Sequence, residues 1–352
     1  MFLNGLGTAV PAQRYTQAEC WAGFQAAPQF ADLSSRSRAI LRKILTGKNG
    51  IEARHLGLAT VQEGFVIDPD TLHQRFFRHA PDLAAKAAIR AMEQAGIDAS
   101  AVDALLISTC TGYLCPGLTS YVSERLGLKS GIHCLDLVGQ GCGAALPTLS
   151  TAAALTASDR ANHALCISVE ICSAAFYLDE DPGVLVSACL FGDGAAAVVV
   201  GREPGPHRRS VRWIAGGSSL RPELRDTLRF EHRGGMLRNL LSPDVPQLAA
   251  ESALNLFQAV AAREKRERDE IRSWVWHPGG RDVLDAIAER FGLTPADLKY
   301  SAAVLRDYGN VSSPCVLFVL DAMLRDGSAP GLWWMSSFGA GFSCHGAFLE
   351  VG

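Results

Sequence analysis

The chain has 352 residues, of which 48% are hydrophobic and 20% charged, and its formal net charge is −3. That length suits one large or two fused globular units, and the nearly balanced charge gives no indication of a nucleic-acid partner. No run of about 18 uninterrupted apolar residues occurs, so we expect no membrane span. Residues 1–11 predict a first strand rather than a signal peptide, and the protein is therefore expected in the cytoplasm.

Apolar residues at three- and four-residue spacing predict a helix over 82–96, and an apolar strand follows at 104–109. A loop to Gly117 and a helix that ends near Leu128 come next. Further apolar strands are predicted in this part of the chain at 133–138, 165–169 and 195–200. Helices that alternate with apolar strands predict a layered α/β protein with largely buried sheets.

The same order of elements returns in the second part of the chain, with a helix over 247–263, a strand at 273–276 and a helix that ends near Leu293. Both second helices end in Glu-Arg-x-Gly-Leu. Chance similarity between α/β segments is the alternative, but this shared ending favours a duplication. We therefore expect two similar α-β-α halves packed together, residues 1–204 and 205–352, which meet in the Gly-, Pro- and Arg-rich stretch 201–212.

The ten cysteines form neither a metal-binding nor a disulfide pattern. No Cys-x-x-Cys pair occurs, and no histidine cluster accompanies Cys110 and Cys115, so no metal site is expected. Most of these thiols lie in apolar runs, which is typical of buried, reduced cysteines. Cys142 differs, because it lies in Gly-Gln-Gly-Cys-Gly at 139–143.

Cys142 follows the predicted strand 133–138 and precedes a helix of small residues, so its thiol is expected at a helix N-terminus. The helix dipole there lowers the pKa of a thiol, and the flanking glycines leave room for an acyl chain. A phosphate-binding loop is the alternative, but the Lys-Ser/Thr of such loops is missing. The pattern favours a nucleophile that forms a thioester.

Two further motifs carry one polar side chain each. His277 lies at a predicted strand tip in His-Pro-Gly-Gly, where it is either structural or able to form an ion pair with Cys142 and to bond a thioester carbonyl. Asn310 lies in Tyr-Gly-Asn-Val-Ser-Ser, where it is either a turn residue or a neutral oxyanion donor. A Cys-His-Asn set without a carboxylate base suits decarboxylation of a malonyl thioester, which needs only stabilisation of the resulting enolate.

These motifs, together with Phe191-Gly-Asp-Gly, resemble those of the type III polyketide synthases, the chalcone synthase family, in order from Ile107 to Gly341. The resemblance implies a thiolase fold and a homodimer. It also implies condensation of malonyl-CoA onto an acyl-CoA starter, with no cofactor besides the CoA thioesters, and a cyclised pyrone, resorcinol or phenolic product. Cys142 would be the nucleophile, His277 and Asn310 the decarboxylation pair, and Phe191 the gatekeeper between CoA tunnel and cavity.

The resemblance also implies substrate contacts. Lys48 matches a residue that binds CoA phosphates, and Cys115 matches one that reaches into the partner subunit's cavity. The cavity itself would be lined by Cys110, Cys172, Ala175, Phe191 and Ser312. We expect selection of the starter there to be steric and apolar, with no cationic or metal site.

Two alternatives stay open. The terminal Ser-Phe-Gly-Ala-Gly at 337–341 resembles that of the ketoacyl-ACP synthase III enzymes, which would make an acyl carrier protein the partner that delivers the chains. A catalytically silent partner subunit that keeps the thiolase fold is the other. Iodoacetamide distinguishes the latter, because a silent subunit has no fast-reacting thiol.

Overall fold

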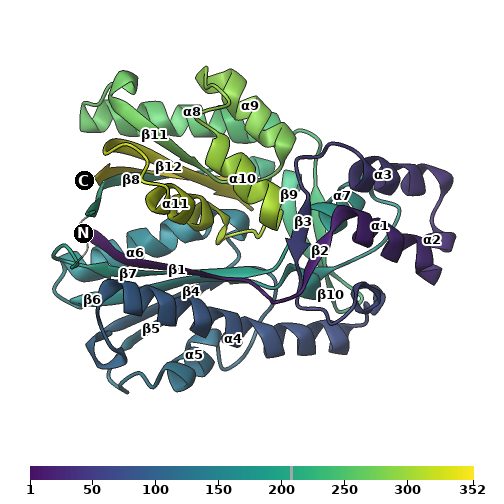
Figure 1. Cartoon of the computed structure of the whole chain (residues 1–352), viewed down its shortest axis with the longest axis horizontal. Coiled ribbons are helices and arrows are strands. Elements are labelled where there is room, and N and C mark those ends of the chain that lie inside the picture. The colour runs from purple at the N-terminus through teal and green to yellow at the C-terminus, as the bar shows by residue number, and fades with distance from the viewer. Residues whose placement is uncertain (207–208) are drawn as a thin grey trace.

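The structure is a computed structural model that describes residues 1–206 and 209–352. Across these residues, nine strands form one mixed sheet in the order β11-β12-β13-β8-β1-β7-β6-β4-β5 (Figure 1). The first half of the chain supplies β1 (Phe2–Ala9), β4 (Ala104–Thr109), β5 (His133–Val138), β6 (His163–Glu170) and β7 (Gly194–Gly201). The second half supplies β8 (Val211–Leu220), β11 (Ile271–Trp276), β12 (Gly331–Gly339) and β13 (Ser343–Val351).

The strand pairing shows the duplication directly. In the series β4-β6-β7-β1 the first pair is parallel and the next two are antiparallel. The series β11-β12-β13-β8 repeats these directions in the same chain order. Within the sheet the two series are joined at one end only, where Phe2 of β1 pairs with Arg212 of β8. Two duplicated halves are thus confirmed. Residues 207–208 of the stretch expected between them lie outside the described residues.

The helices complete five layers (Figure 1). On the outer face of the first half lie α4 (Pro69–Ala95) and α5 (Leu118–Leu126), and on that of the second half lie α8 (Val245–Glu264) and α9 (Arg281–Phe291). Between the halves lie α6 (Ala145–Ala157) and α11 (Cys315–Arg325), which pack against strands of both. Cys142 and Asn310 each come shortly before one of these central helices, so the layering brings them to the same end of the molecule.

Burial explains the composition of each layer. The central helix α11 is buried almost all round, as its continuous apolar sequence requires, whereas α9 buries one stripe that contains Val283, Leu284 and Ile287. The expected helix 82–96 is longer than predicted and begins at Pro69, because Phe76 and Ala80 pack into the same core as Leu83. That burial keeps the chain helical through Pro81.

The remaining elements gather beyond one end of the central helices, at the right of Figure 1. They comprise β2 (Arg14–Thr16), β3 (Ala53–His55), α1 (Gln17–Ala26), α2 (Pro28–Asp32), α3 (Ser35–Thr46), α7 (Pro182–Leu190) and the hairpin of β9 (Leu228–Arg233) and β10 (Met236–Leu241). The helix α10 (Lys299–Tyr308) leads into the turn that carries Asn310. Short 3-10 turns include η3 (Gly141–Gly143) and η4 (Cys172–Ala175).

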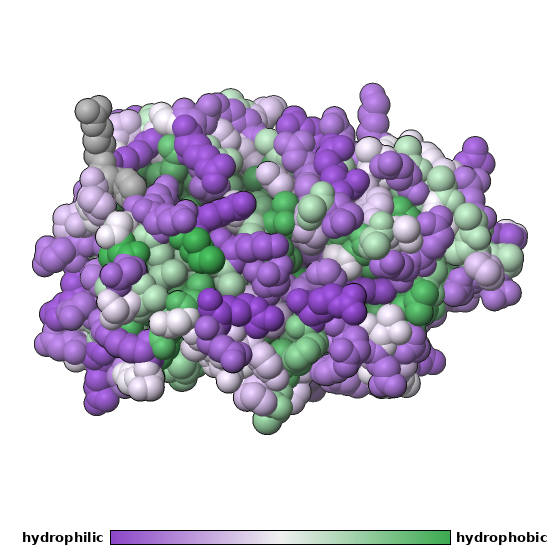
Figure 2. All heavy atoms as spheres, turned by 60° about the horizontal axis from the view of Figure 1, so that its bottom comes forward, coloured by the Kyte–Doolittle hydropathy of each residue, from purple (hydrophilic) through white to green (hydrophobic). Residues whose placement is uncertain are grey.

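None of the helices in the described residues is long and apolar enough to cross a membrane. On the face of the molecule that Figure 2 shows, most of the surface is hydrophilic and apolar residues are scattered among polar ones.

Candidate active site

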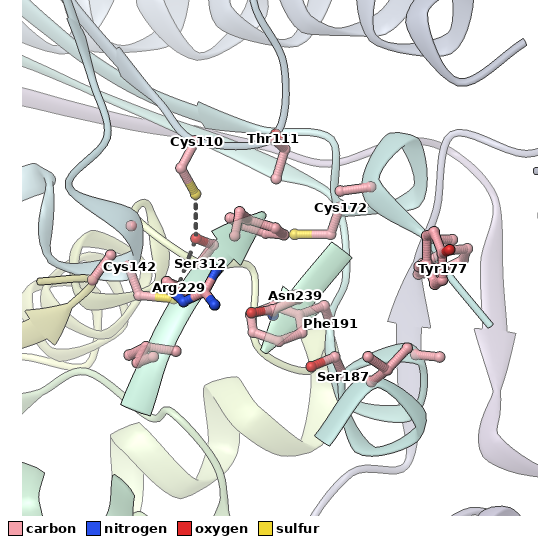
Figure 3. A pocket seen from close by; sticks show the side chains of 18 residues that line it. Cys110, Thr111, Cys142, Cys172, Tyr177, Ser187, Phe191, Arg229, Asn239 and Ser312 are labelled. Carbon is pink, nitrogen blue, oxygen red and sulfur yellow. Dashed lines mark hydrogen bonds between the residues drawn. The ribbon is translucent and has the colours of Figure 1, made fainter. Parts of the chain in front are cut away.

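A pocket that opens to solvent, with about 590 Å³ of empty space including its mouth, lies between the ends of the central helices and the elements gathered beyond them (Figure 3). Six of the residues predicted from the sequence line it, namely Cys110, Cys142, Cys172, Ala175, Phe191 and Ser312. His277 and Asn310 lie directly behind this wall and are tied to it by the contacts described below. Cys115 and Lys48 are exposed and lie outside the pocket.

Cys142 lies in η3, immediately before α6, so its predicted place at the start of a helix is correct. The turn needs glycine at Gly141, where φ is +58° and a Cβ would lie 2.8 Å from the backbone nitrogen of Ala340. The Ser312 hydroxyl donates to Sγ at 3.3 Å. Cys142 is only 8% exposed, and burial raises the pKa of its thiol to about 12 although Ser312 counteracts this. The expected lowering of this pKa is therefore wrong for the free protein, because desolvation of the buried thiol is the largest influence on it.

His277 follows β11, and its backbone nitrogen donates to the carbonyl of Ser336 at 3.0 Å. The ring is fully buried against Phe338, with 5.0 Å between ring centroids, and neither ring nitrogen has a hydrogen-bond partner among the described residues. Burial lowers its pKa to about 3, so the imidazole is neutral. The ion pair with Cys142, one of the two roles that the sequence allowed for His277, is therefore not formed in the free protein. A buried imidazole without partners is suited to bonding a substrate atom.

Asn310 connects the catalytic motifs. Its Nδ2 donates to the carbonyl of Gly279, in the turn that begins with His277, at 3.1 Å. Its Oδ1 accepts from the backbone nitrogen of Ser312 at 2.8 Å. Ser312 has a φ of +59°, a conformation that non-glycine residues adopt at a cost. The strained turn aims the Ser312 hydroxyl at Cys142.

Phe191 is fixed between the turn that carries Asn310 and the helix α7, which ends just before it. It is bridged to Asn310, and its two neighbours Leu190 and Gly192 bond the Asn310 backbone at 2.9 and 3.0 Å. Its side chain packs in one cluster with Cys142 and Cys172. The ring thus forms part of the wall beside the thiol, where a gatekeeping side chain has to lie.

Glu170, at the end of β6, is a buried site residue that sequence reasoning missed. Its carboxylate accepts hydrogen bonds from Cys110 Sγ at 3.3 Å and from the hydroxyls of Thr111 and Ser313 at 2.8 and 2.6 Å. Burial raises its pKa despite these bonds. A signal for it existed, because a glutamate that closes an apolar strand is unusual.

The hairpin of β9 and β10 supplies a wall that the sequence did not predict. Leu228, Arg229, Phe230 and Asn239 line the pocket from it. Arg229 is a cation in this lining and contradicts the expectation of a pocket without one. Its Nε donates to Asp226 at 2.9 Å and its Nη1 to Glu231 at 3.2 Å.

A charge cluster holds the hairpin in place. Arg238 of β10 pairs with Asp179, Asp181 and Glu231 at 2.7, 3.2 and 3.0 Å, and we call these four residues the Arg238 cluster. Although burial works against its charge, the surrounding carboxylates raise the pKa of Arg238. Asp181 also caps α7, where its carboxylate accepts from the nitrogen of Gly183 at 2.8 Å. The cluster thus joins the hairpin to the helix that leads to Phe191.

No group of three or more His, Cys, Asp or Glu side chains in residues 1–206 and 209–352 is placed to hold a metal ion.

Two protein-family models match this chain. One, described as FAE1/type III polyketide synthase-like protein, matches residues 26–214, and the other, the C-terminal domain of chalcone and stilbene synthases, matches residues 223–345. The chain belongs to the type III polyketide synthase family. It is 30% identical over 337 residues to the 3,5-dihydroxyphenylacetyl-CoA synthases of Streptomyces toyocaensis and Amycolatopsis balhimycina. The alignments cover 93% of this chain and 84% and 86% of those proteins.

Solved type III polyketide synthases share the fold. PKS-I of the brown alga Ectocarpus siliculosus matches with a TM-score of 0.90 at 24% identity, over 99% of this chain and 97% of that one. The 1,3,6,8-tetrahydroxynaphthalene synthase of Streptomyces coelicolor A3(2) matches with a TM-score of 0.88 at 24% identity, over 99% of both chains. The thiolase fold is confirmed. As a type III polyketide synthase, the protein is an acyltransferase of secondary metabolism whose family needs no cofactor beyond CoA thioesters.

Proposed function

We propose that this synthase loads an acyl starter from acyl-CoA onto Cys142, extends it by decarboxylative condensation with malonyl-CoA, and releases a cyclised pyrone, resorcinol or phenolic product. The observation that carries the proposal is the buried, unpartnered imidazole of His277, in a turn that Asn310 links to the hydroxyl beside the Cys142 thiol.

Loading begins from a neutral thiol and a neutral imidazole. Because a free imidazole nitrogen accepts a proton, His277 takes the proton of Cys142 as the sulfur attacks the thioester carbonyl. The new S–C bond forms, the bond from carbon to the CoA sulfur breaks, and the CoA thiolate recovers the proton from His277. The thiolate therefore exists only when a substrate is present to receive it.

Condensation then needs an enolate. His277 and the second N–H of the Asn310 amide donate to the thioester oxygen of malonyl-CoA, because the first N–H of that amide is held by Gly279. Carbon dioxide leaves, and its bonding electrons form the enolate. The enolate carbon attacks the acyl carbonyl on Cys142 and forms the new C–C bond. The bond from that carbonyl carbon to Cys142 Sγ breaks, and the sulfur leaves as a thiolate that can accept the lengthened chain from CoA. Fixed donors of this kind are each worth about 10²–10³ in rate.

The assembly that we propose is a homodimer. The strand β5 lies at the edge of the sheet with its side chains largely exposed, among them Leu135 and Val138. Tyr113, in the loop that contains Cys115, is also exposed. An exposed, apolar sheet edge is usually covered, and a second copy would cover it and bring Cys115 toward the partner's cavity. A fully active monomer in sedimentation at micromolar concentration would contradict this.

Other parts of the proposal concern delivery, location and the division of the chain. The exposed Lys48, whose carbonyl accepts a hydrogen bond from Arg281, would bind CoA phosphates outside the pocket. The ten unpaired cysteines favour the reducing cytoplasm. We place the nucleophile in a half of residues 1–204, and His277 and Asn310 in a half of residues 205–352. No observation favours a carrier protein over CoA as the donor.

The test is mass spectrometry of the products formed from malonyl-CoA with short, aromatic and long acyl-CoA starters. We expect condensed, cyclised products with the parent enzyme and none with Cys142→Ala. A parent enzyme that consumes none of these CoA thioesters would contradict the proposal.

A further inference from the structure

Among the buried polar side chains that line the catalytic pocket, one has no hydrogen-bond partner in the described residues. The hydroxyls of Thr111, Ser187 and Ser312 that line the pocket are bonded to Glu170, to the carbonyl of Gly183 and to Cys142, respectively. Asn239 also lines the pocket and is 7% exposed, yet its side-chain amide forms no hydrogen bond with any described residue. Figure 3 shows this side chain among the residues that line the pocket with Phe191 and Ser187.

The hairpin fixes the amide in this position. Asn239 pairs with Phe230 across the hairpin, and its neighbour Arg238 pairs with Glu231. Because successive side chains of a strand point to opposite faces, Arg238 is directed into its charge cluster while Asn239 is directed into the pocket. The cluster that anchors the hairpin therefore also holds Asn239 over the pocket.

A ligand that fills the pocket has to satisfy this amide or leave it buried without a partner. An alkyl or aryl chain has no atom that can bond to it, whereas a carbonyl oxygen accepts from Nδ2 and an enol hydroxyl donates to Oδ1. Sites with such a buried polar group discriminate strongly against ligands that lack the matching group. The amide thus favours an oxygenated chain over a hydrocarbon chain of equal length.

We propose that Asn239 is a specificity-determining residue that hydrogen bonds to a keto or enol oxygen of the growing poly-β-ketoacyl chain. This inference rests on the proposed function and deepens it, since each condensation adds one carbonyl to the chain. Asn239 holds the chain only after a condensation has supplied the oxygen. It thereby favours further extension and cyclisation over early release as a short lactone.

Asn239→Leu tests the role, because leucine keeps the shape of asparagine and removes the amide. With malonyl-CoA and hexanoyl-CoA, we expect the ratio of the longest cyclised product to short lactones to fall about 3- to 10-fold, the worth of one hydrogen bond. Acylation of Cys142 and malonyl-CoA decarboxylation should be unchanged. The midpoint of thermal unfolding should stay or rise, since no protein partner is lost. A residue with a structural hydrogen bond would behave in the opposite way.

Two further variants sharpen the result. Asn239→Ala removes the same amide without adding the leucine methyl groups, so a change shared by both variants belongs to the amide. Arg233→Gln, exposed near the tip of the same hairpin, should leave the product ratio as in the parent. If both Asn239 variants keep the parent's product ratio, the inference is overturned. If the parent forms no polyketide at all, the proposed function fails instead.

Discussion

The catalytic pocket has two walls of different construction. One carries Cys142, Ser312 and Phe191 on turns that adjoin the layered core, and backbone hydrogen bonds and buried side chains fix these turns. The other is the hairpin of β9 and β10, which stands outside the nine-stranded sheet of the described residues as a separate two-stranded unit. Leu228 packs into the core beside it, and the Arg238 cluster supplies its ionic attachment.

The difference separates chemistry from selectivity. The turns of the first wall hold the groups that we propose to react, at positions that the duplicated core dictates. The hairpin holds groups that line the opposite side of the same pocket, and charges and a few apolar contacts suffice to place it. Changes in the first wall should therefore abolish reaction steps, whereas changes in the hairpin should alter which products form.

The largest effect is expected for the groups that stabilise the enolate. His277→Ala and Asn310→Ala should each lower malonyl-CoA decarboxylation about 10²- to 10³-fold, because each removes one donor to the developing oxyanion. Alkylation of Cys142 by iodoacetamide serves as the control and should persist in Asn310→Ala, whereas His277→Ala also removes the base for the Cys142 proton and should slow it. Release of CO2 at the parent rate by both variants would show that the first wall does not carry this step.

The next effect is the pH dependence of Cys142 alkylation. Below its pKa a thiol gains thiolate about tenfold for each unit of pH, and burial raises this pKa to about 12. The rate of Cys142 alkylation in the folded protein, followed after digestion on the peptide that contains Cys142, should therefore rise without a plateau from about pH 6 to about pH 9. A rate that is flat over this range would indicate a preformed thiolate–imidazolium pair and overturn the neutral resting state.

Arg238→Met tests the attachment of the hairpin. It leaves three carboxylates without their shared cation, and because these reach solvent we expect a loss of about 1–3 kcal/mol in the free energy of unfolding. Products should become more varied while Cys142 alkylation is retained. Arg212→Met is the matched control, since it breaks an exposed pair with Glu350 and should cost under about 1 kcal/mol. If both variants lose the same free energy of unfolding and form the parent's products, the distinction between the two walls would not hold.

The smallest effect concerns the depth of the cavity. Ala175, in η4, is buried and lines the pocket, so Ala175→Trp should shorten the longest acyl-CoA starter that is accepted. Each methylene excluded removes about 0.8 kcal/mol of binding. Competition among starters of increasing length measures this. If Ala175→Trp accepts the same range of starter lengths as the parent, Ala175 does not lie on the path of the acyl chain.

The two walls also differ in how far the sequence predicts them. Cys142, His277 and Asn310 are conspicuous because single polar residues lie among glycines next to apolar segments. Asn239 and Arg238 lie in a stretch rich in charges that resembles an exposed loop. Their burial depends on tertiary contacts that the sequence does not show, such as the pairs of Arg238 with Asp179 and Asp181. The pKa shift of Cys142 was predicted with the wrong sign, since the sequence indicates a helix start but not the depth of burial.

The central claim is that Cys142 carries the acyl chain, and mapping the acyl adduct tests it most directly. The pocket holds three thiols, and Cys110 is a real competitor, because its sulfur lies 3.5 Å from the same Ser312 hydroxyl that bonds Cys142. Burial and the carboxylate of Glu170 raise the pKa of Cys110 well above its usual value, which disfavours it as the nucleophile. After brief incubation with an acyl-CoA, peptide mass spectrometry should find the acyl group on Cys142 in the parent and no acyl group in Cys142→Ala. An adduct on Cys110 or Cys172 in the parent, or one that persists in Cys142→Ala, would contradict the account.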